Sequence, residues 1–112
     1  TLEDTVIMGF SQGAMLAHAL LLREQLTMLG LAGCSGRMIR EFVSDGSSVR
    51  QGQPVFLSHG TYDEVIPVVS GHELRNIYES QTGADVTWCE EPVGHDIGPK
   101  MIESMRDWFA AL

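Results

Sequence analysis

The stretch that decides the fold is VIMGFSQGAML, residues 6–16. An apolar run ends at Gly9, Ser11 follows between two glycines, and an apolar helix-forming segment comes next. The spacing Gly-x-Ser-x-Gly is typical of a strand, a sharp turn and a helix, with the serine hydroxyl projecting from a strained corner. Gly9 and Gly13 have no Cβ atom, so we expect neither to collide with the adjoining strand or helix.

A serine at such a corner is placed to act as a nucleophile. The backbone N–H of Gln12 begins the predicted helix, and we expect it to point at an oxygen that develops negative charge near Ser11, with the helix dipole adding to the effect. The alternative is a glycine-rich turn with an incidental serine, because the chain has 12 glycines among 112 residues. The motif therefore needs partner residues before it predicts chemistry.

Periodicity along the chain predicts alternating strands and helices. The predicted strands are residues 5–9, 31–34, 54–60 and 84–92, and the predicted helices are residues 12–29, 69–80 and 99–112. Alternation of this kind predicts an α/β fold of about four parallel strands with flanking helices, in one domain over residues 1–112. The segment AMLAHALLL, residues 14–22, is apolar nearly all round, so we expect it to be covered on several sides.

Two further polar segments follow predicted strands. SHGTYDEVIP, residues 58–67, carries Asp63, and EPVGHDIGP, residues 91–99, carries His95. The chain order Ser11, Asp63, His95 is that of nucleophile, acid and base in the fold to which Gly-x-Ser-x-Gly belongs. Because sites form at the carboxyl ends of parallel strands, we expect these three side chains to meet.

The residue types suit acyl transfer. A histidine that titrates near neutral pH can take the proton of Ser11 and return it to a leaving group, and an aspartate can orient that histidine. Taken singly, Asp63 also fits a turn aspartate and His95 a loop histidine, and Glu64 is a weaker alternative acid. Among the other histidines, we expect His59 to orient the loop of Asp63 and His18 to be a core histidine.

Composition excludes several classes of function. The net charge of −8 leaves no basic footprint for nucleic acid and no basic amphipathic helix for an anionic membrane. No apolar stretch has the ~18 residues that a membrane-spanning helix needs. Cys34 and Cys89 lack the spacing of a metal site and lie in apolar runs, which indicates free thiols and a reducing, cytoplasmic location.

Three segments together carry a family resemblance: GFSQGAML (residues 9–16), HGTYDEVIPV (59–68) and GHDIGPKMIESMRDWF (94–109). They resemble the carboxylesterase/phospholipase, acyl-protein thioesterase-like family of α/β-hydrolases, over nearly the whole chain and most weakly at residues 37–53. The resemblance implies a catalytic triad of Ser11, Asp63 and His95, with the backbone N–H of Gln12 in the oxyanion hole. It implies hydrolysis of esters or thioesters of short to medium acyl chains through an acyl-enzyme on the serine, without metal or cofactor.

Members of this family are about twice as long, so the resemblance implies only the C-terminal half of the fold. The missing half includes the loop that supplies the second oxyanion donor. The strand before Ser11 becomes a bare edge, and we expect it to pair in a homodimer. The alternative is a catalytically incompetent half-domain that acts as a binding or assembly module. Met38, Ile39 and Phe42 either line an acyl pocket or pack the crossover connection.

Overall fold

Four parallel strands form the centre of the molecule, in the order β1-β2-β3-β4. The structure is a computed structural model and describes residues 2–24, 26–39 and 49–112. Its elements are η1 (Leu2–Asp4), β1 (Val6–Phe10), α1 (Gln12–Arg23), β2 (Gly30–Cys34), β3 (Pro54–Gly60), α2 (Val68–Gln81), β4 (Asp85–Glu91) and α3 (Pro99–Ala110). The predicted α/β class and parallel strands are therefore confirmed.

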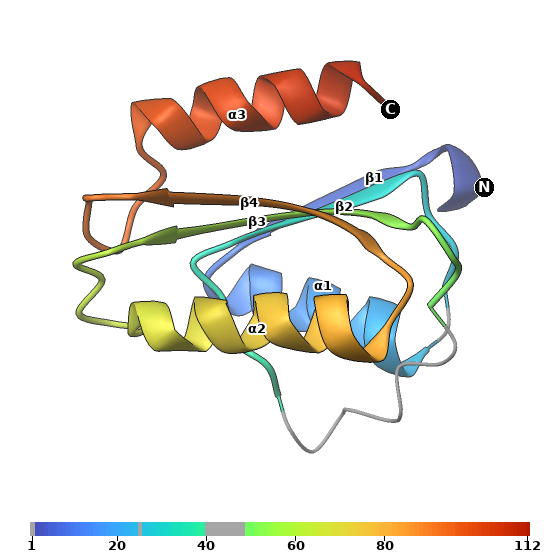
Figure 1. Cartoon of the computed structure of the whole chain (residues 1–112), viewed down its shortest axis with the longest axis horizontal. Coiled ribbons are helices and arrows are strands. Elements are labelled where there is room, and N and C mark those ends of the chain that lie inside the picture. The colour runs from blue at the N-terminus through green and yellow to red at the C-terminus, as the bar shows by residue number, and fades with distance from the viewer. Residues whose placement is uncertain (1, 25, 40–48) are drawn as a thin grey trace.

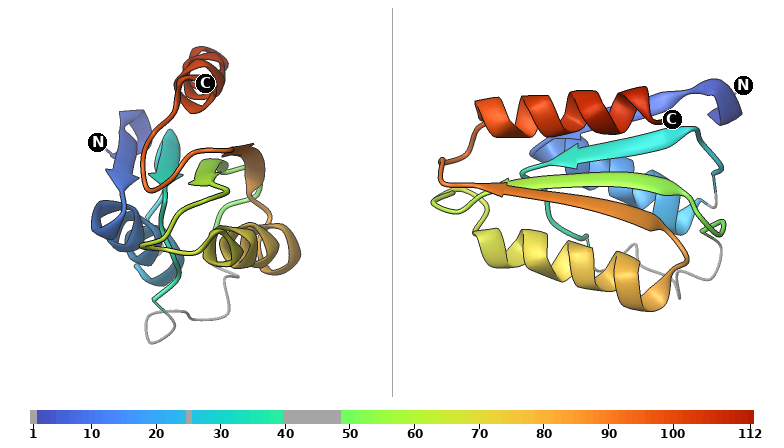
Figure 2. Two further views of the ribbon diagram at one scale, coloured as in Figure 1. Left: turned by 90° about the vertical axis from the view of Figure 1, so that its left-hand side faces the viewer. Right: turned by 45° about the horizontal axis from the view of Figure 1, so that its top comes forward.

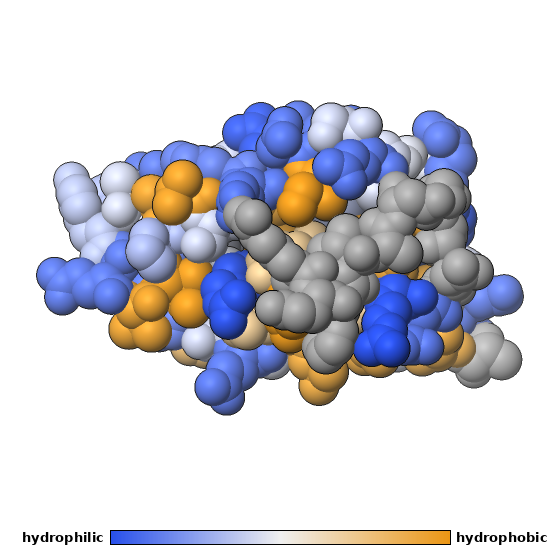
Figure 3. Space-filling model, turned by 90° about the horizontal axis from the view of Figure 1, so that it is seen from below, coloured by the Kyte–Doolittle hydropathy of each residue, from blue (hydrophilic) through white to orange (hydrophobic). Residues whose placement is uncertain are grey.

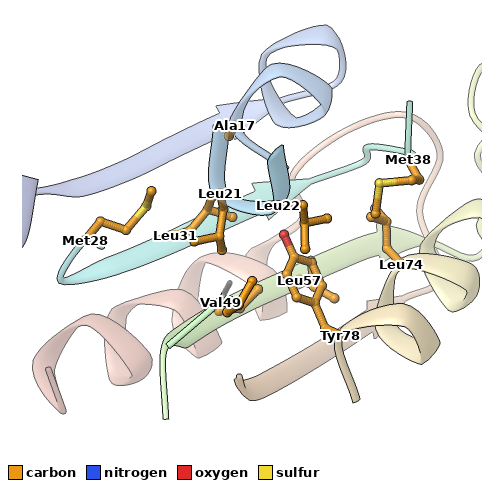
Figure 4. Close-up of a cluster of buried hydrophobic side chains, with 11 residues drawn as sticks. Ala17, Leu21, Leu22, Met28, Leu31, Met38, Val49, Leu57, Leu74 and Tyr78 are labelled. Carbon is orange, nitrogen blue, oxygen red and sulfur yellow. The ribbon is translucent and has the colours of Figure 1, made fainter. Parts of the chain in front are cut away.

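Helices cover both faces of the sheet. Helices α1 and α2 lie on one face and α3 lies on the other (Figure 1, Figure 2). The larger core cluster lies between the sheet and the two-helix layer, where Leu21 of α1, Leu57 of β3 and Tyr78 of α2 come together (Figure 4). A smaller cluster packs Trp108 of α3 against Phe56 of β3.

The first helix is shorter than predicted. It ends at Arg23, although the apolar pattern predicts a helix up to residue 29. The reason is tertiary: the N–H of Leu29 donates a hydrogen bond to the carbonyl oxygen of Thr5, so the chain must leave the helix to run beside β1. Met28 is fully buried in the larger core cluster, so this apolar residue belongs to the crossover and not to a helix face.

The other predicted strands and helices are present, and each begins and ends within two residues of its predicted bounds.

Helix α1 is only partly buried, although the sequence predicts that it is covered on several sides. Ala14, Ala17, His18, Leu21 and Leu22 are buried, but Leu16 is 60% exposed. Figure 3 shows this two-helix face, where apolar side chains form separate groups among hydrophilic ones. In the part of the chain that the structure describes, no helix combines the length and the apolar character needed to cross a bilayer.

Strand β1 is an edge of the sheet and pairs only with β2 among the described strands. The N–H of Ser11 donates to the carbonyl oxygen of Cys34, so the backbone groups of Ser11 face β2. The N–H and C=O groups of successive residues in a strand point alternately to its two sides. Those of Met8 and Phe10 therefore point away from β2, toward the open edge of the sheet. Beside this edge lies an apolar groove of about 470 Å³, lined by Met8, Ile97, Ile102, Met105, Arg106 and Phe109.

Candidate active site

Ser11 lies at the corner between β1 and α1. Its φ of 56° and ψ of −116° are unusual for a residue with a side chain, and such backbone strain is concentrated at functional sites. Gln12 is the first residue of α1, and the first N–H groups of a helix have no acceptor within the helix. The predicted strand, sharp turn and helix are therefore present, with the N–H of Gln12 beside the serine.

The two glycines of the motif differ in their surroundings. A Cβ atom on Gly9 would overlap the backbone of Gly13 and Ala14, so glycine is required where β1 and α1 touch. A Cβ atom on Gly13 would meet nothing within 4 Å. The expectation that both glycines relieve a collision is correct for Gly9 and wrong for Gly13, because the side of α1 at Gly13 faces open space.

His95 comes from the loop after β4 and lies between the other two polar side chains. Its Nε2 atom is 2.9 Å from Oγ of Ser11, and its Nδ1 atom is 2.7 Å from Oδ2 of Asp63. An ionised carboxylate only accepts hydrogen bonds, so Nδ1–H donates to Asp63 and Nε2 is left to accept from the hydroxyl of Ser11. The ring of Phe10 packs against the imidazole, with 4.9 Å between the ring centroids.

Asp63 is buried at the start of the turn after β3. Burial alone would raise the pKa of its carboxyl, but hydrogen bonds from His95 and from the N–H groups of Ile66 and Val65 hold that pKa below its usual value. The two N–H groups lie 2.8 Å and 2.9 Å from Oδ1. The side chain is thus charged at neutral pH and has a separate oxygen for each set of donors.

The loops that carry the acid and the base are joined by backbone hydrogen bonds. The N–H of Tyr62 donates to the carbonyl oxygen of Val93 over 3.0 Å, and Gly60 packs so closely on Val93 that a Cβ atom would overlap its carbonyl group. Glu91, for which the sequence pattern predicts no role, is buried and accepts a hydrogen bond from the N–H of Met101 over 3.0 Å. It anchors the start of α3 directly after the loop of His95.

Two of the three proposed acyl-pocket residues, Met38 and Ile39, lie in the part of the chain that the structure describes. Met38 is buried in the larger core cluster near Leu74 (Figure 4), which corresponds to the packing alternative. Ile39 is partly buried, and Phe42 lies outside the described residues. Within the described ranges, no group of three or more His, Cys, Asp or Glu residues is arranged to hold a metal ion.

The sequence is similar to known proteins over nearly its whole length. The sequence profile of the family described as Phospholipase/Carboxylesterase matches residues 1–112. Acyl-protein thioesterase 1 of Eremothecium gossypii is 34% identical over 97% of this chain and 48% of its own length, and that of Yarrowia lipolytica is 33% identical over 93% and 48%. The chain thus spans about half the length of these curated relatives.

Solved structures show the same partial coverage. The carboxylesterase of Bacillus cereus superposes with a TM-score of 0.86 at 24% identity, over 99% of this chain and 51% of that enzyme. This likeness supports the fold, and it shows that the four parallel strands with their helices correspond to about half of that enzyme's chain.

Proposed function

Because this chain belongs to the phospholipase/carboxylesterase family, we propose that it is a serine hydrolase that cleaves carboxylic esters or thioesters at Ser11. One observation carries the proposal: an unbroken hydrogen-bond chain, 2.9 Å from Ser11 to His95 and 2.7 Å from His95 to Asp63. In this proposal Ser11 is the nucleophile, His95 the general base and acid, and Asp63 the group that orients the imidazole.

The reaction proceeds in two halves. Oγ of Ser11 attacks the carbonyl carbon of the substrate while its proton moves to Nε2 of His95, and the charge of Asp63 stabilises the imidazolium. The tetrahedral intermediate collapses when Nε2 returns that proton to the leaving alcohol or thiol, which leaves an acyl-enzyme. Water then attacks the acyl carbon, again with His95 as base, and the acid is released with Ser11 restored.

The backbone N–H of Gln12 is the proposed donor to the oxyanion. Loss of one oxyanion donor lowers rates by roughly 10²–10³-fold. We therefore expect this N–H to contribute much of the rate, and we propose esters of short to medium acyl chains as the substrates. No metal or cofactor has a part in these steps.

We further propose that the chain pairs with a second copy through β1. A partly apolar edge strand such as β1, which pairs on one side only among the described strands, is a site for strand pairing, and Met8 is 54% exposed beside the groove under α3. A two-fold ladder of two β1 strands is antiparallel, so the carboxyl end of the partner's strand lies far from Ser11. Such a dimer covers the edge without adding an oxyanion donor.

Free Cys34 and Cys89 are consistent with a reducing, cytoplasmic setting.

Intact-mass measurement after incubation with a fluorophosphonate probe tests the hydrolase proposal. We expect one adduct on the parent chain and none on Ser11→Ala. Ser80→Ala is the matched control, because Ser80 is exposed on α2 and its hydroxyl donates a hydrogen bond to the carbonyl oxygen of Asn76. The Ser80→Ala protein should still form the adduct on Ser11. A folded parent chain without an adduct would overturn the proposal in favour of the binding or assembly module.

A further inference from the structure

A second histidine lies beside the proposed triad. His59, near the end of β3, is 1% exposed, and its Nε2 atom is 2.7 Å from the carbonyl oxygen of Ile66. Because a carbonyl oxygen only accepts, Nε2 carries a hydrogen and donates it. The same nitrogen lies 3.5 Å from Oδ2 of Asp63, the oxygen that receives the hydrogen bond from His95.

His59 closes the turn that presents Asp63. The N–H of Ile66 donates to Oδ1 of Asp63 over 2.8 Å, and the carbonyl oxygen of Ile66 accepts from His59. The N–H and the C=O group of Ile66 therefore both form hydrogen bonds with buried side chains. The turn of residues 63–66 has no freedom to rotate without breaking one of these buried hydrogen bonds, each costly to leave unmade.

Helix α2 holds the imidazole of His59 from another side. A Cβ atom on Gly71 would lie 2.7 Å from Nδ1 of His59, 3.0 Å from its Cγ and 3.0 Å from Cη2 of Trp88. These approaches are closer than side chains allow, so the absence of a side chain at Gly71 lets the helix backbone rest on the ring. The orientation of the ring, and with it the direction of Nε2–H, is set by packing.

We propose that His59 is a positioning residue for the pair Asp63–His95, acting through the turn of residues 63–66. The inference rests on the proposed hydrolase function and extends it, since His59 itself touches neither Ser11 nor the reacting atoms. The hydrogen bond from His59 to Ile66 fixes the position of the turn, and the turn fixes the position of the Asp63 carboxylate. The carboxylate in turn fixes the orientation of the His95 imidazole. A displacement of this carboxylate is transmitted to the nucleophile because each link is a single short hydrogen bond.

Three variants separate positioning from general packing. His59→Gln keeps an N–H near the place of Nε2, and His59→Leu keeps the volume without the donor. His72→Gln is the matched control, because His72 lies on α2 close by but is exposed and bonds to Glu90, 2.7 Å away, and not to the turn. The two readouts are the rate constant for fluorophosphonate labelling of Ser11 and the NMR signal of the proton on Nδ1 of His95.

We expect His59→Leu to lower the labelling rate constant on the order of 10- to 100-fold and to shift or broaden the Nδ1 proton signal. His59→Gln should recover most of the rate and the signal, and His72→Gln should match the parent chain. Equal rates and unchanged signals for His59→Leu and His72→Gln would overturn the inference. If the parent chain itself is not labelled, the hydrolase proposal fails, but the NMR comparison still tests the positioning of His95.

Should His59→Leu not fold, Gly71→Ala provides the same test. The added methyl group displaces the imidazole of His59 without removing either of its ring nitrogens. A lower labelling rate with a shifted Nδ1 signal supports the inference, and a folded Gly71→Ala protein with the parent rate and signal contradicts it.

Discussion

Gly9 and Gly13 face each other across the corner at Ser11, and only one of them needs to be glycine. A Cβ atom on Gly9 would overlap the backbone of Gly13, whereas a Cβ atom on Gly13 would have open space around it. Of the two glycines, only Gly9 must lack a side chain for β1 and α1 to approach this closely. Substitution of each glycine by alanine therefore tests the local structure at the nucleophile corner.

We expect Gly9→Ala to lower the free energy of unfolding by about 1–3 kcal/mol or more, because backbone atoms must move apart to admit the methyl group. Gly13→Ala should be neutral or raise that free energy by up to about 1 kcal/mol, since alanine favours a helix. Urea unfolding followed by circular dichroism measures both. Equal stabilities for the two variants would show that Gly9 does not make the close contact.

Much of the fold and of the site follows from local sequence pattern. Strand and helix periodicity predicts all four strands, and the shared edge of parallel strand ends predicts that Ser11, Asp63 and His95 meet, as their hydrogen bonds now show. Such predictions succeed because they depend on residues close together in sequence or on one rule of sheet topology.

Other features depend on contacts between distant segments and were not predictable. The end of α1 is set by the hydrogen bond from Leu29 to Thr5 and by burial of Met28, which periodicity alone does not distinguish from a helical face. The role of Glu91 requires knowing that the N–H of Met101 lies beside it. The position of His59 before the acid loop predicts that it orients this loop, but its hydrogen bond to Ile66 and its packing on α2 are visible only in three dimensions.

Asp63→Asn should leave the protein folded and slow the labelling of Ser11 by roughly 10²–10⁴-fold, because an amide cannot hold His95 in the required tautomer. Glu64→Gln is the control, since Glu64 is the adjacent, exposed acid. Fluorophosphonate labelling rates, measured beside circular dichroism spectra, test the pair. A similar loss in Glu64→Gln and none in Asp63→Asn would move the acid role to Glu64.

Met8→Lys should abolish self-association, because a charged side chain on an exposed edge strand opposes pairing with another strand. Val69→Lys provides the control, since Val69 is 61% exposed on α2, away from β1. Sedimentation equilibrium at micromolar concentration should give a dimer for the parent chain and for Val69→Lys, and a monomer for Met8→Lys. A monomeric parent chain would contradict pairing through β1.

His18 should make the protein less stable in mild acid. It is fully buried against Tyr78, with 2.8 Å between Nδ1 and the phenol oxygen, and burial lowers its pKa from 6.5 to about 4. Between these values the unfolded chain binds a proton that the folded chain does not, so the free energy of unfolding falls as pH falls from 6.5 toward 4. The full loss from this group is on the order of 3 kcal/mol.

The measurement is urea unfolding of the parent chain and of His18→Gln at a series of pH values. Glutamine retains a hydrogen-bonding group beside Tyr78 but does not titrate, so the difference between the two unfolding free energies should shrink as pH falls through this window. The lowered pKa of Asp63 acts with the same sign but only at lower pH, since its ordinary value is 3.8, and it is common to both proteins. A difference that stays constant from pH 7 to pH 4 would mean that His18 becomes charged in the folded protein.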